Sequence, residues 1–228
     1  GGIGFIATGI ILFPFLRIAG MQLFKMESSD VGDKATARMI DTVRQILMLY
    51  LLATLLGAIA MMLIGDLTFF NAIIHAMTAI STGGFSTSDS SVMQFDSRAI
   101  EAVLLVMMLI GGATFPLLIM AMSGRPGPLW NDPQIRLFLG VILIAAGSIA
   151  AWRFTQGAGD PVSLFWSALF NVTSIITTTG YMSADYTQWG SFPVIVFFFI
   201  TFLGGCTGST SGGLKAYRLY VLALVVQT

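Results

Sequence analysis

The sequence has few of the side chains that proteins use for acid, base or metal chemistry. Charged residues make up only 10% of the 228 residues, and there is one cysteine, Cys206, and one histidine, His75. A single cysteine excludes an internal disulfide framework and a cysteine-based metal site. The 11 basic and 11 acidic side chains cancel to a formal net charge of zero, which gives no indication of a nucleic-acid partner.

In place of charge, the sequence has long apolar stretches. Hydrophobic residues account for 56% of the chain and charged residues for only 10%. Soluble domains carry roughly 25% charged residues. Because ~20 apolar residues are enough to cross a membrane, the charge-free windows indicate a polytopic membrane protein. Five windows predict crossing helices: 1–16, 45–65, 102–124, 137–152 and 186–214.

Two further uncharged windows, 67–88 and 161–184, are apolar only in their first halves. They end in the hydroxyl-rich and glycine-containing stretches "STGGFSTS" and "TTTGYMSA". An apolar helix that stops halfway and is followed by such a turn does not fit a complete span. We therefore predict that both windows are re-entrant hairpins.

The two hairpin windows are copies of one another at an offset of 96 residues. "FFNAIIHAMTAISTGGFSTSD" aligns with "FWSALFNVTSIITTTGYMSAD", so Thr82 pairs with Thr178 and Gly84 with Gly180. Downstream, "GGATFP" at 111–116 resembles "GGCTGS" at 204–209, and both resemble the opening "GGIGFI". These repeats predict an all-α membrane protein with complete units at 39–133 and 134–228. Residues 1–38 are expected to be the second helix of a truncated first unit and a cytoplasmic loop, so that the chain is a fragment.

Each hydroxyl-rich turn has the chemistry of a cation site. Irregular backbone at membrane depth is tolerated only where it lines a watery cavity. Glycine permits the backbone angles that aim successive carbonyls at one axis, and the preceding helix directs its negative end at the same point. One such stretch alone reads as an ordinary surface loop, but two copies favour an ion filter. We expect Gly84 and Gly180 to face one another across the axis.

The stretch "GGCTGSTSGG" at 204–213 interrupts the last apolar window. Glycine costs ~1 kcal/mol relative to alanine inside a helix, so five glycines in ten residues predict an unwound segment. At membrane depth such a segment must lie beside water, which indicates a gate in the pore. Because the earlier copies lack the extra glycines, we expect the strongest break here. The alternative is a close helix contact built on small residues.

Enzyme chemistry finds no support in these windows. Leu214 separates Gly213 from Lys215, which rules out a phosphate-binding loop, and "GSTSG" has Thr210 where a serine hydrolase has its nucleophile. The membrane windows contain neither a nucleophile with a base nor a pair of carboxylates. The only side chain in the two hairpin windows that can ionise near neutral pH is His75, whose repeat counterpart Asn171 suggests a polar packing role.

The order helix, pore helix, filter turn and helix, with "TGGF" and "TTTGY" turns and the interruption "GGCTGSTSGGLK", resembles the TrkH family of bacterial Trk potassium uptake systems, within the Trk/Ktr/HKT superfamily. The resemblance covers essentially the whole chain and implies potassium uptake without catalysis or a cofactor. It implies a filter formed by Ser81, Thr82, Gly83, Gly84, Thr177, Thr178, Thr179 and Gly180. Backbone atoms of the threonines and glycines at 82–84 and 178–180 would bind potassium.

The resemblance also implies a gate and partners. The gate loop would comprise Gly204, Gly205, Cys206, Thr207, Gly208, Ser209, Thr210, Ser211, Gly212, Gly213 and Lys215. Implied partners are the lipid bilayer, a second copy forming a homodimer, and a cytoplasmic nucleotide-binding regulatory subunit, with residues 25–44 as a candidate docking loop. The implied location is the bacterial inner membrane. The sequence leaves open an ion-coupled potassium symporter and a non-conducting membrane scaffold.

Overall fold

The computed structural model describes residues 31–227, and the regular elements within that range are all helices. This confirms the all-α prediction, while the window 1–16 and the "GGIGFI" copy lie outside the described residues. The elements are α3 (Val31–Gly65), α4 (Phe69–Ile80), η1 (Ser91–Phe95), α5 (Arg98–Gly112), α6 (Phe115–Met122), α7 (Gly127–Asn131), α8 (Pro133–Thr155), α9 (Pro161–Ile176), η2 (Tyr186–Gln188), α10 (Ser191–Ile200) and α11 (Ala216–Gln227).

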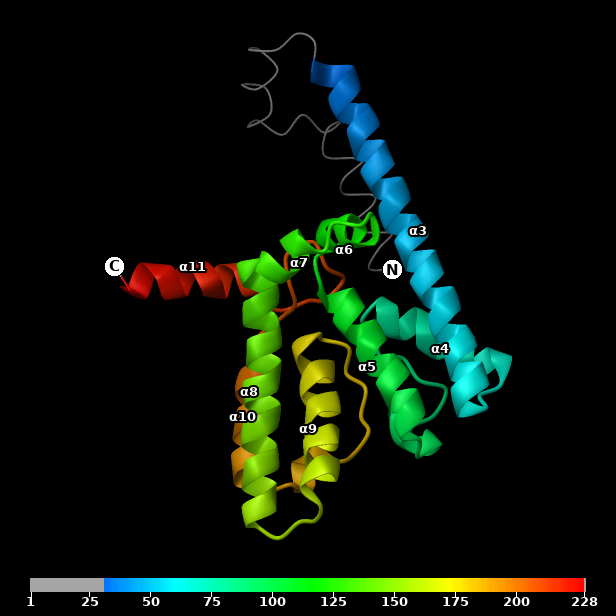
Figure 1. Ribbon diagram of the computed structural model, residues 1–228. Helices are drawn as coiled ribbons and strands as arrows, with labels where there is room; N and C mark the ends of the chain where they lie inside the picture. The colour runs from blue at the N-terminus through cyan, green and yellow to red at the C-terminus, as the bar shows by residue number, and fades with distance from the viewer. Residues whose placement is uncertain (1–30, 228) are drawn as a thin grey trace.

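The helices around the two hairpin windows form two groups. In Figure 1, α3, α4 and α5 form one group, and α8, α9 and α10 form the other. Helix α4 packs between α3 and α5 through a face of small residues, including Ala72, Ala76 and Ala79, which are fully buried. Small side chains let helices approach closely, so the short helix is held near the middle of its group.

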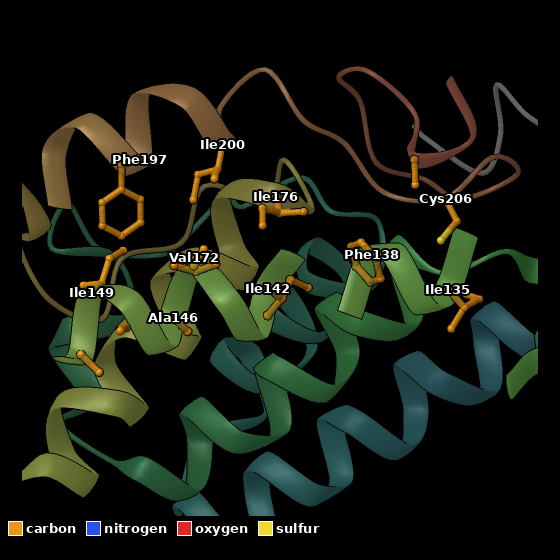
Figure 2. Packing of buried hydrophobic residues seen from close by; sticks show 14 of the residues in the cluster. Ile135, Phe138, Ile142, Ala146, Ile149, Val172, Ile176, Phe197, Ile200 and Cys206 are labelled. Carbon is orange, nitrogen blue, oxygen red and sulfur yellow. The ribbon is translucent and has the colours of Figure 1, made fainter. Parts of the chain in front are cut away.

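The second group is built on the apolar face of α8. Ile142, Ala146 and Ile149 of this helix pack against Val172 and other residues of α9, and Figure 2 shows these side chains interleaved. Both helices begin with proline at the first turn after a capping aspartate. Asp132 accepts hydrogen bonds from two backbone amides of α8, and Asp160 accepts one from α9. These caps define where each helix starts.

The helices of the two hairpin windows are too short for complete spans, which is what the prediction of re-entrant hairpins requires. Helix α4 has 12 residues and α9 has 16, which correspond to about 18 Å and 24 Å, short of the ~30 Å hydrocarbon core. After the turn that follows α4, the chain returns to Arg98, whose guanidinium donates to Ser163 in the first turn of α9 at 2.5 Å. The end of the first hairpin thus lies beside the start of the second.

Not every predicted span is a single helix. Residues 41–65 of α3 and the whole of α8 are long and apolar enough to cross a membrane. The window 102–124, in contrast, contains α5 and α6, which meet at a bend of 111°. The window 186–214 contains only the ten-residue α10 before irregular backbone begins. The prediction of one continuous helix at 102–124 is therefore wrong, whereas the break inside 186–214 agrees with the interruption predicted at 204–213.

Proline explains the bend between α5 and α6. Pro116 has no amide hydrogen, and inside a continuous helix its ring would clash with the carbonyl of Gly112, four residues earlier. The helix therefore stops at Gly112 and restarts at Phe115, which leaves the carbonyls at the end of α5 available to other partners. The break is thus caused by the proline of this copy and not by its glycines.

Candidate functional site

The turns at 81–84 and 177–180 have the same backbone geometry. In the first, the amides of Gly83 and Gly84 both donate to the carbonyl of Thr78, at 2.8 and 3.2 Å. In the second, the amides of Thr179 and Gly180 both donate to the carbonyl of Ser174, at 2.9 and 3.2 Å. Thr78 and Ser174 are related by the 96-residue offset. The repeat in sequence is thus a repeat in hydrogen bonding.

Each turn contains two residues with positive φ. Gly84 and Gly180, with φ of 68° and 87°, were expected to need this freedom. Thr82 and Thr178 have φ of 51° and 57°, which is a rare conformation for a β-branched residue. Nothing in the composition of the turns predicts strained threonines. Strain of this kind persists only where surrounding contacts impose it, and it is concentrated at functional sites.

The two turns lie side by side and in contact. A Cβ atom added to Gly84 would lie 1.8 Å from the carbonyl oxygen of Thr179, so the backbones meet directly at this point. A Cβ added to Gly180 would meet nothing within 4 Å. The expectation that Gly84 and Gly180 face one another across an axis is therefore wrong, because consecutive repeats place their turns next to each other.

The glycine-rich segment, residues 204–213, is irregular backbone between α10 and α11. Its two ends are joined, since the amide of Gly204 donates to the carbonyl of Leu214 at 2.9 Å and the amide of Leu214 donates to Phe202 at 3.0 Å. Inside the segment, the hydroxyl of Ser211 accepts from the amide of Gly205 at 2.8 Å. Lys215 donates to the carbonyl of Ser211. The predicted unwinding is confirmed, and the segment is a closed loop.

The loop docks on the broken end of α5. The amide of Cys206 donates to the carbonyl of Gly112 at 2.9 Å, and the amide of Thr210 donates to the carbonyl of Gly111 at 3.0 Å. These are the carbonyls left available by the proline-induced break. In return, the amide of Phe115 donates to the carbonyl of Gly208 at 3.2 Å. The loop is thus held by the neighbouring repeat as well as by its own turn contacts.

The same loop contacts both strained threonines. Thr82 donates its hydroxyl hydrogen toward the hydroxyl of Thr210 at 3.2 Å, and the hydroxyl of Thr178 accepts from the amide of Gly212 at 2.7 Å. Thr210 also lies within hydrogen-bond distance of the carbonyl of Ile80, at 3.2 Å. The glycine-rich segment therefore lies directly against both turns and links them.

Glycine is required in the loop by close approach. A Cβ atom on Gly204 would lie 2.0 Å from the carbonyl oxygen of Gly212. A Cβ atom on Gly205 would lie 2.5 Å from the carbonyl oxygen of Gly112. Gly208 and Gly213 have φ of 76° and 68°. The small residues thus permit close packing, as the alternative interpretation held, but between a loop and a helix end rather than between two helices.

His75 and Asn171 occupy equivalent places behind the two turns. The ring of His75 lies 2.7 Å from the carbonyl of Asn71 through Nδ1 and 3.0 Å from the hydroxyl of Ser86 through Nε2. Asn171 donates to the carbonyl of Ser167 at 2.8 Å and to the hydroxyl of Ser183 at 3.0 Å. Both side chains are fully buried, and each connects its short helix, α4 or α9, to the chain that follows the turn. This fits the polar packing role predicted for His75.

A polar cavity of about 280 Å³ lies where α5 and α9 begin. Arg98 and Glu101 line it from α5, and the indole of Trp166 donates to Glu101 at 2.5 Å. Asp185, in the loop after the second turn, is partly exposed. The hydroxyl of Thr187 donates to it and lowers the pKa of this carboxyl, so Asp185 stays ionised to lower pH than a free aspartate.

Comparison with known proteins places these features in a family. The family model of the TrkH cation transport proteins matches residues 1–158 and 159–227. The chain is 42% identical over its whole length to the Trk system potassium uptake protein TrkI of Halomonas elongata, covering 46% of that protein. It is 33% identical over 97% of its length to TrkH of Escherichia coli K12, covering 47% of it.

A solved structure has the same fold. The crystal structure of the potassium transporter TrkH from Vibrio parahaemolyticus superimposes with a TM-score of 0.81 at 32% sequence identity, over 98% of this chain and 45% of that one. The chain thus spans about half the length of the curated relatives it matches. Since the family model covers nearly all of the sequence, the chain belongs to the TrkH family of cation transport proteins.

Proposed function

We propose that this chain forms part of a potassium uptake pore, with the turns at 81–84 and 177–180 as two sides of its filter. The observation that supports this most directly is the identical, strained backbone of two turns that lie in contact. Glycines and left-handed threonines at the ends of short helices provide closely spaced carbonyl groups, and carbonyl oxygens can replace the hydration shell of a bare cation.

In this proposal the ions bind to backbone atoms of residues 82–84 and 178–180. Gly180 is exposed and has open space at its α-carbon, as expected for a residue beside the ion path. Its φ of 87° is accessible to glycine but costly for other residues. The negative C-terminal ends of α4 and α9 lie at the turns and favour a positive ion there.

The glycine-rich segment is the proposed gate. It is irregular, lies against both turns through Thr82 and Thr178, and is docked on the end of α5 by hydrogen bonds. A segment that blocks the pore in one state and withdraws in another must have contacts that can be exchanged. Hydrogen bonds to the carbonyls of Gly111 and Gly112 are of that kind, because water could replace the loop amides.

The wider assembly belongs to the same proposal. The similarity to proteins of Trk systems supports a bacterial membrane location, a second copy of the subunit and a nucleotide-binding regulatory partner on the cytoplasmic side. Residues 25–44 remain the candidate docking segment for that partner. Residues 25–30 lie outside the described residues, and 31–44 belong to helix α3 and not to the loop that the sequence predicted. Co-purification of the partner with a variant in which Lys34, Arg38 and Arg44 are replaced by alanine tests this surface.

The test of the filter is the substitution Gly180→Ser in the full-length transporter. A side chain at this φ forces the turn to shift and moves its carbonyls, while the open space around Gly180 leaves the helices undisturbed. We expect the preference for rubidium over sodium to fall, measured as competitive uptake in proteoliposomes and normalised to reconstituted protein. Gly157→Ser is the control, since Gly157 has φ of 69° and open space but lies at the far end of α8. An unchanged ion preference at normal protein amounts would show that the turn is not a filter.

A further inference from the structure

Tyr181 follows the second turn in sequence but belongs to the core of the other repeat. Its side chain is 1% exposed and packs in the cluster formed by α3, α4 and α5, with Ala76 and Ile80 of α4 among its members. Phe85 is the equivalent residue of the first turn at the 96-residue offset, and it is 74% exposed. The two aromatic residues after the turns therefore have different surroundings.

The hydroxyl of Tyr181 reaches the residue that organises the first turn. It lies 2.5 Å from the hydroxyl of Thr78 and 3.4 Å from the carbonyl oxygen of Phe85. The carbonyl of Thr78 accepts hydrogen bonds from the amides of Gly83 and Gly84. The hydroxyl of Thr78 lies 2.9 Å from the carbonyl of Phe85. Tyr181 can donate to Thr78, whose single hydroxyl hydrogen has two acceptors at 2.9 Å, the carbonyl of Phe85 and the carbonyl of Ile74 in its own helix. When Thr78 donates to Phe85, the two repeats are linked. This chain of hydrogen bonds ends on the backbone immediately after Gly84.

Backbone contacts fix the same junction. The amide of Met93 donates to the carbonyl of Met182 at 3.2 Å, and the amide of Met182 donates to the hydroxyl of Ser91 at 3.1 Å. His75, behind the first turn, stacks on the ring of Tyr181 with centroids 6.0 Å apart. The residue after Gly180 is thus held to the first repeat by its ring, its hydroxyl and its neighbour's backbone.

We propose that Tyr181 is a positioning residue for ion selection, which locks the 81–84 turn to the 177–180 turn through the hydroxyl of Thr78. The inference rests on the proposed filter function and adds to it a residue outside both turns. Since the carbonyl of Thr179 already touches Gly84, a shift of Tyr181 relative to Thr78 changes the spacing of oxygens from both turns. Discrimination between ions of different size depends on the arrangement of such oxygens.

The hydroxyl can be removed without removing the ring. In Tyr181→Phe the aromatic packing remains, and the hydroxyl contacts are lost: the short one to Thr78 at 2.5 Å and the longer ones to the carbonyls of His75 and Phe85 at 3.3 and 3.4 Å. The expected result in the full-length transporter is a fall of about 2- to 10-fold in the rubidium-over-sodium preference, as one hydrogen bond allows. The amount of folded protein and the maximal rubidium uptake should change much less than the preference does.

Two variants at position 78 test the path. Thr78→Val removes the same hydrogen bond and should lower the preference to a similar extent, whereas Thr78→Ser keeps the hydroxyl, as Ser174 does in the other repeat, and should retain it. The double variant Tyr181→Phe with Thr78→Val should lower the rubidium-over-sodium preference no further than the more severe of the two single variants, because both substitutions remove the same bond.

The matched control is Tyr186→Phe. Tyr186 lies five residues further on and packs its ring on Phe197 with centroids 4.3 Å apart, away from the turns. An unchanged preference in Tyr181→Phe, strictly additive losses in the double variant, or an equal loss in Tyr186→Phe would overturn the proposal. If Gly180→Ser lowers the preference and Tyr181→Phe does not, the filter stands and the role of Tyr181 is wrong. If neither lowers it, the filter proposal itself fails.

Discussion

At the scale of single residues, backbone conformation distinguishes the four positions of each turn. Glycine at 84 and 180 was predictable, because the turn needs a residue that adopts positive φ. Threonine at 82 and 178 adopts it as well, against its own preference, and in both turns its hydroxyl contacts the glycine-rich segment. The strain is thus located where the proposed filter and the proposed gate meet.

The two glycines should differ in their tolerance of a side chain. Gly84→Ala introduces a Cβ 1.8 Å from the Thr179 oxygen, whereas Gly180→Ala introduces one into open space. Both substitutions should reduce the stability of the fold by roughly 1–2 kcal/mol, because a non-glycine residue is placed in a left-handed conformation. Gly84→Ala should lose about 1–3 kcal/mol more through overpacking. We expect Gly84→Ala to lower the melting temperature of the detergent-purified full-length protein clearly more than Gly180→Ala. Equal melting temperatures would contradict the contact between the turns.

At the scale of elements, the sequence predicted the features whose causes lie within one short stretch of chain, and it did not predict contacts between distant stretches. Short apolar helices followed by hydroxyl-rich turns were predictable, because helix length and turn chemistry lie within one stretch of sequence. The docking of the loop on α5 was not, because it needs Pro116 to break one helix and the amides of Cys206 and Thr210, about ninety residues later, to fill the gap. Partners so distant in sequence leave no periodic signal.

The repeat also led to a wrong prediction. Residues that are equivalent in the two repeats were expected to lie opposite one another, and they do not. Gly84 and Gly180 are equivalent at the 96-residue offset, but the two turns that contain them lie side by side. Phe85 and Tyr181 show the same limit, since one ring is exposed and the other is buried in the adjacent repeat. The offset identifies matching residues, and the contacts between repeats must come from the structure.

The loop contact gives a prediction for gating. Thr210→Val keeps the volume of the side chain but removes the hydroxyl, which lies within hydrogen-bond distance of the carbonyls of Ile80 and Gly111 and accepts from Thr82. If the loop blocks the pore, weakening this contact should raise partner-independent rubidium uptake by about 2- to 10-fold. Deleting residues 207–211 should raise it further. Uptake is measured in proteoliposomes with and without the regulatory partner.

Thr201→Val is the matched control for the loop. Thr201 lies at the end of α10, and its hydroxyl donates to the carbonyl of Phe197 in its own helix at 2.7 Å, so its loss leaves the docking on α5 intact. If the loop is only a packing contact, Thr210→Val and the deletion should reduce protein yield and uptake together. Uptake that falls in step with yield, or that stays dependent on the partner, would leave the glycines as packing residues.

At the scale of the whole molecule, the two repeats are joined at three levels along α5 and α9. Tyr181 and the contact between Gly84 and Thr179 join them at the turns, and the loop joins them at the end of α5. Where α5 and α9 begin, the indole of Trp166 donates to Glu101 at 2.5 Å. Trp166 lies ten residues before the end of α9, about 15 Å along the helix from the 177–180 turn, so this contact should affect stability without affecting ion preference.

Trp166→Phe tests that separation. The substitution keeps an aromatic ring but leaves the partly buried carboxylate of Glu101 without its indole donor, which should cost about 1–3 kcal/mol of stability. We expect a lower melting temperature of the full-length protein in detergent, while the rubidium-over-sodium preference of the surviving protein stays at the wild-type value. Trp130→Phe is the control, because Trp130 is 63% exposed and should melt like the wild type. A changed ion preference in Trp166→Phe would mean that the turns depend on the whole interface between the repeats, and the specific role assigned to Tyr181 would then extend to every contact that holds α5 against α9.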